Sequence, residues 1–482
     1  MPKHGHDERM LATGRTLDRR GVSRRKLVKS AAGFAAAPVL LKYAGQSVGA
    51  QEEIPREKSS ATIDGKLRIL LKTDFHPDYN AFMDQELKAY AEVNGWDIEV
   101  SDVAGYAAGS DLYQKLQGQV GAGDAPDLLI HDIDVRNLHT LGLIQPVSDM
   151  VAEAVEAFGE PVPGFVFDAN FDDEWWAVPF FTRAGGYYVR QDIFEEHGLD
   201  VIADMEYYDK MREAALAVTN ADENQWGWGM TVNRSGDGNS LVQNVIFRFG
   251  GHLQDEAGEI VTFNSPETIA GLEWLAATYT EEQYQPMLPP GILSWTDTSN
   301  NEAFISGQIV ITQNAGTMYA KAVFDQVPFA DQIAYIPVPR RLSDDQRLDF
   351  LSGMKFHLIT DAKNKDASYD LIRHFLTEPV KQEVWRISRA YALPAYRVGW
   401  ENPVITENAN SMQGKEIALN PGGFTGLSWP GPDTAAVSSI AAGTFFTDMM
   451  SEIIQGRSAD EVVGEYHDRF VQVYQDFGFK GE

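Results

Sequence analysis

Two histidines and two aspartates gather in one short segment, at His131, Asp132, Asp134 and His139. Imidazole and carboxylate groups are common metal ligands. Two histidines eight residues apart with acids between them match no metal-binding spacing, however, and the segment directly follows an apolar run typical of a strand. We therefore interpret these side chains as the polar loop at the end of a strand, and we predict no metal site.

Sequence signatures of catalysis are missing from this chain. It contains no H-E-x-x-H, no G-x-S-x-G, no P-loop and no G-x-G-x-x-G after a strand. It also has no cysteine, which excludes disulfides, thiolate zinc sites and a cysteine nucleophile. We expect no enzymatic activity and no cofactor. An extracytoplasmic glycan hydrolase stays open as an alternative, because the two carboxylates of such an enzyme converge in space and not in sequence.

The elements that must position any site alternate along the first part of the chain. Three apolar runs predict strands and two helical patterns predict the helices between them: 67–71, 98–100 and 127–130 for the strands, 79–93 and 112–120 for the helices. This alternation indicates a mostly parallel sheet covered on both faces. Ligands of such sheets bind beyond the carboxyl ends of the strands, so the loops there are the first places to seek a site.

A second α/β block follows the segment 175–182. Its elements are predicted at 186–189, 309–311 and 356–359 for strands, and at 205–218 and 367–376 for helices. Ser265-Pro266 begins another helix, and Ser458 with Glu461 predicts a capping box on the last one. The segment 236–239, taken alone, has the composition of a turn. We predict a two-domain α/β protein with a cleft.

The first fifty residues have the pattern of an export signal. Residues 23–29 (SRRKLVK) contain a pair of arginines, an apolar stretch follows at 31–41, and small residues at 48–50 suit a cleavage site. We predict a twin-arginine signal peptide at 1–50 and a flexible leader at 51–61, which places the mature protein in the periplasm or outside the cell. An amphipathic basic helix is the alternative interpretation of the signal.

The formal net charge is −30, from 40 basic and 70 acidic residues. Such a surface repels nucleic acid and anionic lipid headgroups, so we expect neither as a partner. A surface adapted to salt would explain the same charge, and the charge therefore excludes partners without naming one.

Several segments, in order along residues 64–480, resemble the extracellular solute-binding proteins of ABC importers, the maltose-binding-protein-like family. The segments are 125–132 (APDLLIHD) with 141–147 (LGLIQPV), 176–179 (WAVP) with 187–199 (YYVRQDIFEEHGL), 303–311 (AFISGQIVI), 376–382 (LTEPVKQ) with 392–395 (ALPA), and 454–461 (IQGRSADE). One departure is 203–208 (ADMEYY), where the family has proline and tryptophan.

The resemblance implies the two-lobed periplasmic-binding-protein fold of type II, with discontinuous lobes joined by a hinge. Lobe one would comprise 62–179 and 336–392, and lobe two 180–335 and 393–482. Prolines fall at the expected crossings, at Pro179, Pro337, Pro339 and Pro394. The function implied is capture of a solute by hinge closure and delivery to ABC permease membrane subunits, by a monomer. A receptor that reports ligand occupancy to a sensor would use the same fold.

Ligand-binding residues are implied by position in the family's contact loops. They are Asp74, His76, His131, Asp132, Asp134, Arg183, Asn239, Ser240, Asn314, Thr317 and Trp429. Aromatic rings that stack on sugar C–H faces, with amides and carboxylates that bind hydroxyl groups, favour a sugar or oligosaccharide as ligand. Arg183 would instead suit a carboxylate or phosphate, so a uronate, a sugar phosphate or an anionic compatible solute stays open. Arg183 disfavours a polyamine.

Overall fold

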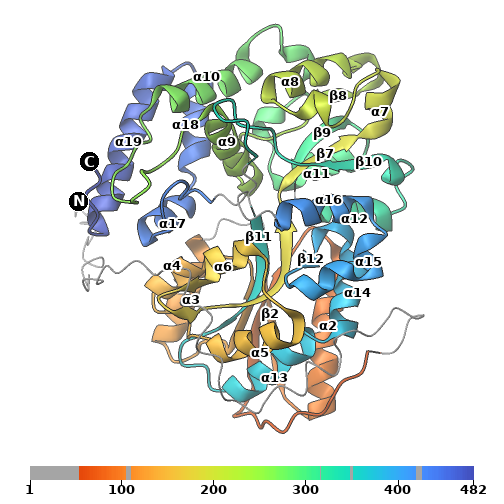
Figure 1. The fold of residues 1–482 in the computed structure, drawn as a ribbon, viewed down its shortest axis with the longest axis vertical. Helices are drawn as coiled ribbons and strands as arrows, with labels where there is room; N and C mark the ends of the chain where they lie inside the picture. Colours follow the sequence, from red (N-terminus) through yellow and green to blue (C-terminus); the bar gives the residue numbers. More distant parts are fainter. Residues whose placement is uncertain (1–53, 105–109, 315, 348–350, 420–425) are drawn as a thin grey trace, which may run out of the picture.

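The computed structural model of the protein describes residues 54–104, 110–314, 316–347, 351–419 and 426–482. The predicted signal peptide at 1–50 lies outside the described residues. Two β-sheets, each with its own covering helices, form a lower and an upper body in Figure 1. We call the body built on the larger sheet lobe one and the other lobe two. No helix in the described part of the chain is long and apolar enough to cross a membrane.

The sheet of lobe one has six strands in the order β12-β6-β11-β3-β1-β2. Their bounds are β1 (Leu67–Thr73), β2 (Ile98–Ala104), β3 (Leu128–His131), β6 (Val178–Ala184), β11 (Leu351–Leu358) and β12 (Leu393–Pro394). β1 pairs in parallel with β2 and β3, whereas β11 runs antiparallel to β3 and β6. The predicted parallel pairing is therefore confirmed for one half of the sheet, whereas the strand pairs of the other half are antiparallel.

Helices cover both faces of this sheet because its strands are apolar on both sides. In β1, Leu67, Ile69 and Leu71 belong to one buried core, and Leu70 to another. The first core is closed by α2 (Pro77–Asn94), α5 (Ser148–Phe158), α13 (Lys365–Phe375) and α14 (Glu378–Ser388). The second is closed by α3 (Ser110–Gly121) and α4 (Val135–Thr140), and α6 (Pro163–Ala169) packs on α4 and β11. β4 (Asn170–Phe171) and β5 (Glu174–Trp175) form a small hairpin.

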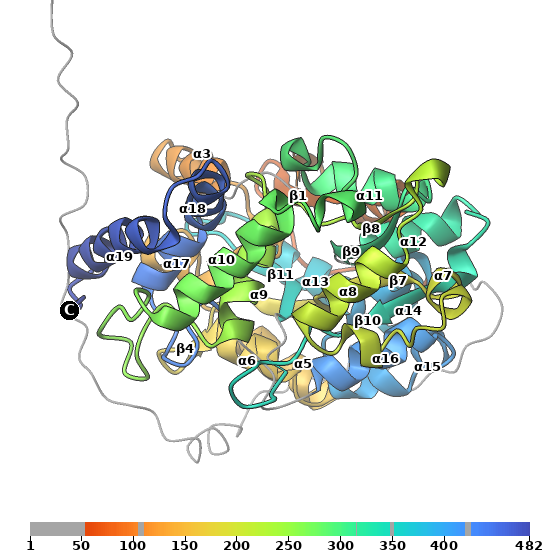
Figure 2. The same ribbon diagram turned by 90° about the horizontal axis from the view of Figure 1, so that it is seen from above.

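The sheet of lobe two has four strands in the order β10-β7-β9-β8. They are β7 (Gly186–Arg190), β8 (Trp226–Trp228), β9 (Ile309–Asn314) and β10 (Ile333–Ile336). The helices of this lobe are α7 (Gln191–Glu196), α8 (Tyr208–Ala217), α9 (Gly236–Phe249), α10 (Pro266–Thr280), α11 (Asp297–Ile305), α17 (Ala435–Ala441), α18 (Phe445–Ile454) and α19 (Ala459–Asp476). Figure 2 shows α9 and α10 side by side, and they pack closely.

The chain passes between the lobes more than once. It leaves β6 at Ala184 and enters β7 at Gly186, where a Cβ atom would lie 2.4 Å from the ring of Tyr335. Pro179, which we expected at this crossing, instead lies inside β6, in the sheet of lobe one. The return passes between β10 and β11, a region that includes Pro337 and Pro339.

Near the last crossing the chain stays with lobe one longer than expected. β12, which contains Pro394, pairs with β6. α15 (Pro403–Thr406) and α16 (Ala409–Ala418) follow at the seam, where α16 contacts β6 and β10. α12 (Thr317–Phe324) also lies there, against α14. From Leu427 onward the chain packs in the core of lobe two. Our boundary at residue 392 was carried over from the family resemblance, which does not reveal the strand pairing of this chain.

Two local predictions were wrong. The segment 236–239 is the first turn of α9, because Ser235 caps it at the Gly238 amide and Asp297 accepts hydrogen bonds from the amides of Gly236 and Asp237. The glycines, which are poor helix formers, hid this helix. At the last helix Ser458 is the N-cap, but in the described structure its side chain makes no capping hydrogen bond.

Candidate functional site

Five polar side chains meet where strands of lobe one end. They are Lys72, Asp74, Asp132, Arg183 and Tyr391, and we call them the charged cluster. Lys72 is in β1 and Asp74 follows it, while Asp132 follows β3. Arg183 is near the end of β6, and Tyr391 is in the short helix η6 (Arg389–Tyr391). β1 and β3 are parallel, so their carboxyl ends meet at one edge and bring the residues together.

Ion pairs join the charged cluster into one network. Nζ of Lys72 lies 2.9 Å from Oδ2 of Asp74 and 2.9 Å from Oδ2 of Asp132. The guanidinium of Arg183 pairs with Asp132, and its Nη1 lies 3.7 Å from Oδ2 of Asp74. Nη1 also donates to Oη of Tyr391 at 3.4 Å, and Tyr391 donates to Asp74. Two cations thus face two carboxylates.

The cluster is nearly closed off from solvent. The side chain of Lys72 is 3% exposed, and those of Asp74, Asp132 and Arg183 are 12% exposed. Burial, with the charge of Arg183, lowers the pKa of Lys72 to about 8. Burial would raise the pKa of Asp74, but Lys72 and Arg183 together hold it well below its ordinary value. Asp74 is therefore ionised at neutral pH and can only accept hydrogen bonds.

A second layer of charges lies behind the cluster. Lys355 of β11 is buried and pairs with Asp168 of α6. Nδ1 of His131 lies 3.0 Å from Asp132, yet it accepts a hydrogen bond from the amide of Ile133 at 2.9 Å. Burial and the charge of Lys72 also hold the pKa of His131 well below its ordinary value. His131 is therefore neutral and does not form an ion pair with Asp132.

Lobe two contributes a group of amides around one aspartate. We call Asp237, Asn300, Asn301 and Asn314 the amide cluster. Nδ2 of Asn300 and Nδ2 of Asn314 donate to Oδ2 of Asp237, at 2.8 Å and 3.1 Å, and Asn314 also donates to Asn301. Asp237 is in the first turn of α9, Asn300 and Asn301 are in α11, and Asn314 is the last residue of β9.

The two clusters are close enough to interact electrostatically. Burial raises the pKa of Asp237 well above its ordinary value, the charge of Asp297 adds to this, and Asp74 of lobe one also contributes. The hydrogen bond from Asn300 opposes the shift. Trp295, at the start of the same region, is partly buried and packs against the cores of both lobes. Asp237 of lobe two therefore lies within electrostatic range of Asp74 of lobe one.

The structure brings together some of the residues that we predicted. Asp74, Asp132 and Arg183 form the charged cluster, His131 lies directly behind it, and Asn314 belongs to the amide cluster. Asp134 is the N-cap of α4 and accepts from the amide of Asn137 at 2.7 Å. Thr317 is buried at the start of α12, and Ser240 is partly buried in α9.

Other predicted residues have contacts elsewhere. His76 is 1% exposed, its Nε2 lies 3.0 Å from the carbonyl of Ile387, and its ring packs on Phe324. Asn239 ties α9 to α18 through Gly443 and Thr447. The indole of Trp429 lies under the guanidinium of Arg341, 4.3 Å from ring centroid to Cζ, and beside His252.

Sequence reasoning missed Lys72, Tyr391, Asp237, Asn300 and Asn301. Lys72 had a signal, since a lysine at the end of an apolar strand must find partners when the strand is buried. Asn300 and Asn301 had no sequence signal, because they lie in α11, which approaches Asp237 only in the folded structure.

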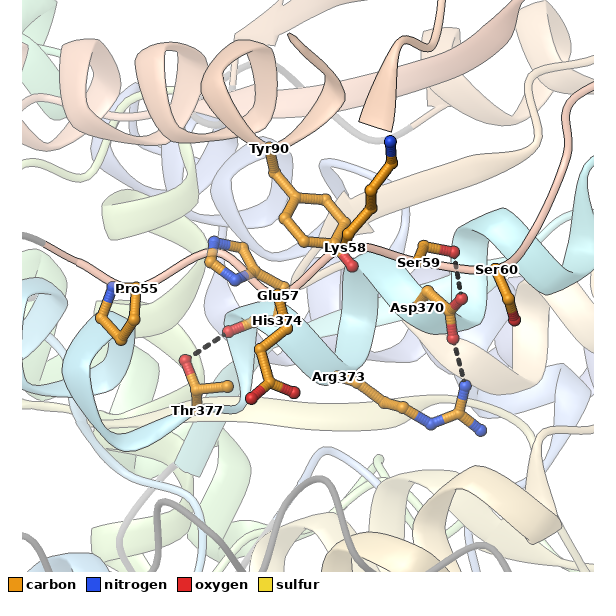
Figure 3. Close-up of a pocket in the computed structure, with 10 residues that line it drawn as sticks. All are labelled: Pro55, Glu57, Lys58, Ser59, Ser60, Tyr90, Asp370, Arg373, His374 and Thr377. Atoms are coloured by element: carbon orange, nitrogen blue, oxygen red, sulfur yellow. Dashed lines mark hydrogen bonds and ion pairs between the residues drawn. The ribbon is translucent and has the colours of Figure 1, made fainter. Parts of the chain in front are cut away.

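A separate pocket of about 310 Å³ lies on lobe one, away from both clusters. Figure 3 shows its walls, which come from the leader, α2 and α13. Tyr90 stacks on His374 there, with ring centroids 4.3 Å apart, and Asp370 bonds to Ser59 and Arg373. Its polar groups are largely paired with one another, so we assign no ligand to it.

Sequence comparison shows that the chain is similar to known solute-binding proteins. A model of the family described as bacterial extracellular solute-binding protein matches residues 76–382. A mannitol-binding protein of Pseudomonas aeruginosa is 25% identical over 288 residues, which are 58% of this chain and 60% of that protein. The match therefore spans less than two thirds of this relative.

Solved structures share the fold at low sequence identity. Maltose-bound MalE3 of T. maritima has a TM-score of 0.70 and 18% identity, and the match covers 84% of this chain and 98% of that one. A solute-binding protein of Agrobacterium radiobacter in complex with ribitol has a TM-score of 0.70 and 15% identity, with 86% and 99% coverage. These relatives confirm the predicted type II periplasmic-binding-protein fold. With its family model matched over most of its length, the chain belongs to the bacterial extracellular solute-binding proteins.

Proposed function

We propose that this protein captures a neutral sugar or polyol between the charged cluster and the amide cluster, and delivers it to the membrane permease of an ABC importer. Membership of a solute-binding family supports capture of a small molecule outside the cytoplasm. The names of the relatives, which bind mannitol, maltose and ribitol, support a polyhydroxylated ligand.

Charge balance is the observation that favours a neutral ligand. Lys72 and Arg183 are engaged by Asp74 and Asp132, and the nearby Lys355 is engaged by Asp168. The amide cluster of lobe two adds amides and an aspartate, and its described members include no cation. A carboxylate or phosphate ligand would have to break these ion pairs or meet uncompensated negative charge, which is costly in a buried site. The guanidinium of Arg183 is thus better explained as a structural partner of Asp132.

The chemistry of the two walls suits hydroxyl groups. A sugar hydroxyl both donates and accepts, so it needs a carboxylate on one side and an amide, lysine or arginine on the other. Asp74 is an ionised acceptor, and Lys72 and Arg183 are donors. Trp295 offers a partly buried aromatic surface for the C–H face of a sugar ring.

Binding would work by hinge closure. A ligand that contacts both clusters binds the closed arrangement better than the open one, and so shifts the population toward it. The chain segments between β6 and β7, and between β10 and β11, would serve as hinges. We further propose that the protein reaches the periplasm or cell exterior by the twin-arginine signal at 1–50, and acts there as a monomer without altering its ligand.

A thermal-shift screen tests this function. Neutral sugars and polyols, uronates, sugar phosphates and betaines are each added to the protein. A ligand present at a free concentration of about a hundred times its dissociation constant raises the free energy of unfolding by about 2.7 kcal/mol. We expect hits among neutral sugars or polyols, recovered chemically unchanged. Hits only among anions would contradict the neutral assignment, and a consumed ligand would contradict the binding role.

A further inference from the structure

The lobes also touch at a place outside both clusters. Nε of Arg136 in α4 lies 3.0 Å from Oδ2 of Asp433, which precedes α17 of lobe two. One residue further along α4, Nδ2 of Asn137 donates to the carbonyl of Ser438 at 3.3 Å. Figure 1 shows α4 and α17 next to each other across the junction, and they are in contact. The side chains of Arg136 and Asp433 are 20% and 12% exposed, so closure removes this ion pair from most of the solvent.

Two further carboxylates surround this ion pair. Asp134, at the N-cap of α4, and Asp168 of α6 both lie close enough to act on Asp433. Asp168 already pairs with Lys355, and Arg136 is the cation that faces Asp433 directly. Other titratable groups near the junction, among the described residues, include Tyr113 of α3, His139 of α4 and Tyr474 of α19. Closure therefore brings the carboxylate of lobe two toward two carboxylates of lobe one.

We propose that α4 and residues 433–438 form a latch that holds the lobes together without ligand, and that Asp433 opens this latch as the solution becomes more alkaline. The inference rests on the proposed hinge closure, and it concerns the regulation of that closure. The latch lies outside the ligand-contacting clusters, so it changes the open–closed equilibrium without changing the contacts made to the ligand.

The direction of the pH effect follows from the environment of Asp433. Burial, and then the charges of Asp134 and Asp168, raise the pKa of Asp433 to about 7, against the opposing effect of Arg136. Burial and the charge of Asp168 raise the pKa of Asp134 as well. Opening returns Asp433 to water and to the ordinary carboxyl range. The closed form thus binds the proton more tightly, and the closed population falls as the pH rises from the ordinary carboxyl range to about 7.

The test measures the distance between the lobes without ligand. The chain has no cysteine, so cysteines introduced at the exposed positions Glu92 of lobe one and Glu282 of lobe two can carry a fluorophore pair. We expect the closed-to-open ratio of the otherwise native protein to fall about tenfold per pH unit between about pH 5 and 7, and to level off above.

Three variants test whether Asp433 and Arg136 control the open–closed ratio and its pH response. Asp433→Asn keeps the shape and removes the charge, so its open–closed ratio should lose most of this pH response. Arg136→Ala should raise the open population at about pH 7. Arg457→Ala, which removes an ion pair within lobe two, is the matched control and should behave as the native protein.

The outcomes separate the latch from the proposed function. A pH-independent distance in the native protein, or a pH response fully retained in Asp433→Asn, would overturn the latch while ligand-induced closure could still be observed. Failure of every tested sugar to shorten the distance, in native and variant proteins alike, would instead contradict hinge closure. The ligand-free distances would then still decide whether the latch exists.

Discussion

Tyr391 donates a hydrogen bond from its phenol group to Oδ2 of Asp74, a residue 317 positions earlier in the chain. The bond joins the end of β1 to the short helix after α14, next to Arg183. The ring of Tyr391 packs edge-on against Tyr79 and Phe181, with centroids 5.9 Å and 5.5 Å away. Hydrogen bond and packing together fix the carboxylate that we assign to the ligand.

Tyr391→Phe removes this hydrogen bond and keeps the ring contacts. Because the acceptor is charged, we expect the free energy of unfolding to fall by about 2 kcal/mol. Urea unfolding measures this change. Tyr396→Phe is the control, since its phenol oxygen is buried without a hydrogen-bond partner in the described structure. Equal losses in both variants would show that the Tyr391 hydroxyl does not stabilise the cluster.

Arg183→Met leaves the carboxylates of Asp132 and Asp74 with one buried cation in place of two. We expect this variant to lose about 3 kcal/mol of stability, and the double variant with Asp132→Asn to lose less than Arg183→Met alone. Urea unfolding of the four proteins of this double-mutant cycle measures the coupling. Additive losses would contradict a direct Arg183–Asp132 partnership. Arg457→Met, at an exposed ion pair, is the control and should unfold nearly as the native protein does.

Asp237→Asn tests the raised pKa of this buried carboxyl group. A carboxyl whose pKa is raised on folding costs stability once the pH exceeds its ordinary value of 3.8, and the cost grows up to the raised value. The asparagine variant avoids this cost, so its stability relative to the native protein should increase as the pH rises above that ordinary value. Asp222→Asn, at an exposed position, should show no such trend. A difference that is constant with pH would contradict the raised pKa.

Arg56→Ala tests whether the leader is part of the folded structure. Arg56 pairs with Glu86, whose side chain is 3% exposed and also bonds to His374. Burial would raise the pKa of Glu86, but these hydrogen bonds lower it below 4.5. The pair therefore stabilises the protein above that pH, and its contribution is lost as the pH falls through the lowered pKa.

We expect Arg56→Ala to lose about 2 kcal/mol near neutral pH and progressively less below about pH 4. Thermal or urea unfolding across this pH range measures the loss. Native stability at neutral pH would instead mean that the pairing of Arg56 with Glu86 does not hold the leader to the fold. Lys88→Ala, at an exposed ion pair with Asp84, is the control.

The order of the elements and half of the charged cluster could be predicted from the sequence. Apolar runs mark β1 and β3, and parallel pairing then requires Asp74 and Asp132 to lie at one edge. Tyr391 could not be predicted, because it reaches this edge through η6, more than two hundred residues after β3. The same holds for Lys355 of the layer behind the cluster, which arrives through β11. Strand β11 lies between β3 and β6 and is antiparallel to both, and the hydrophobic pattern of a strand does not indicate its neighbours or its direction.

Trp429 illustrates a different limit. The family resemblance implied that Trp429 contacts the ligand, but the partner of an indole depends on tertiary packing. In the structure the indole of Trp429 contacts the guanidinium of Arg341 and the ring of His252. Trp295, which packs against both cores, had no distinguishing sequence pattern.

The central claim is that a neutral sugar or polyol binds between the two clusters. Isothermal titration of the native protein with the sugar or polyol that gives the largest thermal shift, repeated with Asp74→Asn and Asp237→Asn, tests it most directly. Loss of one hydrogen-bonding carboxylate on either wall should weaken binding by at least about tenfold, while Trp429→Phe should bind as the native protein does. Unchanged affinity in both aspartate variants would contradict a site between these clusters.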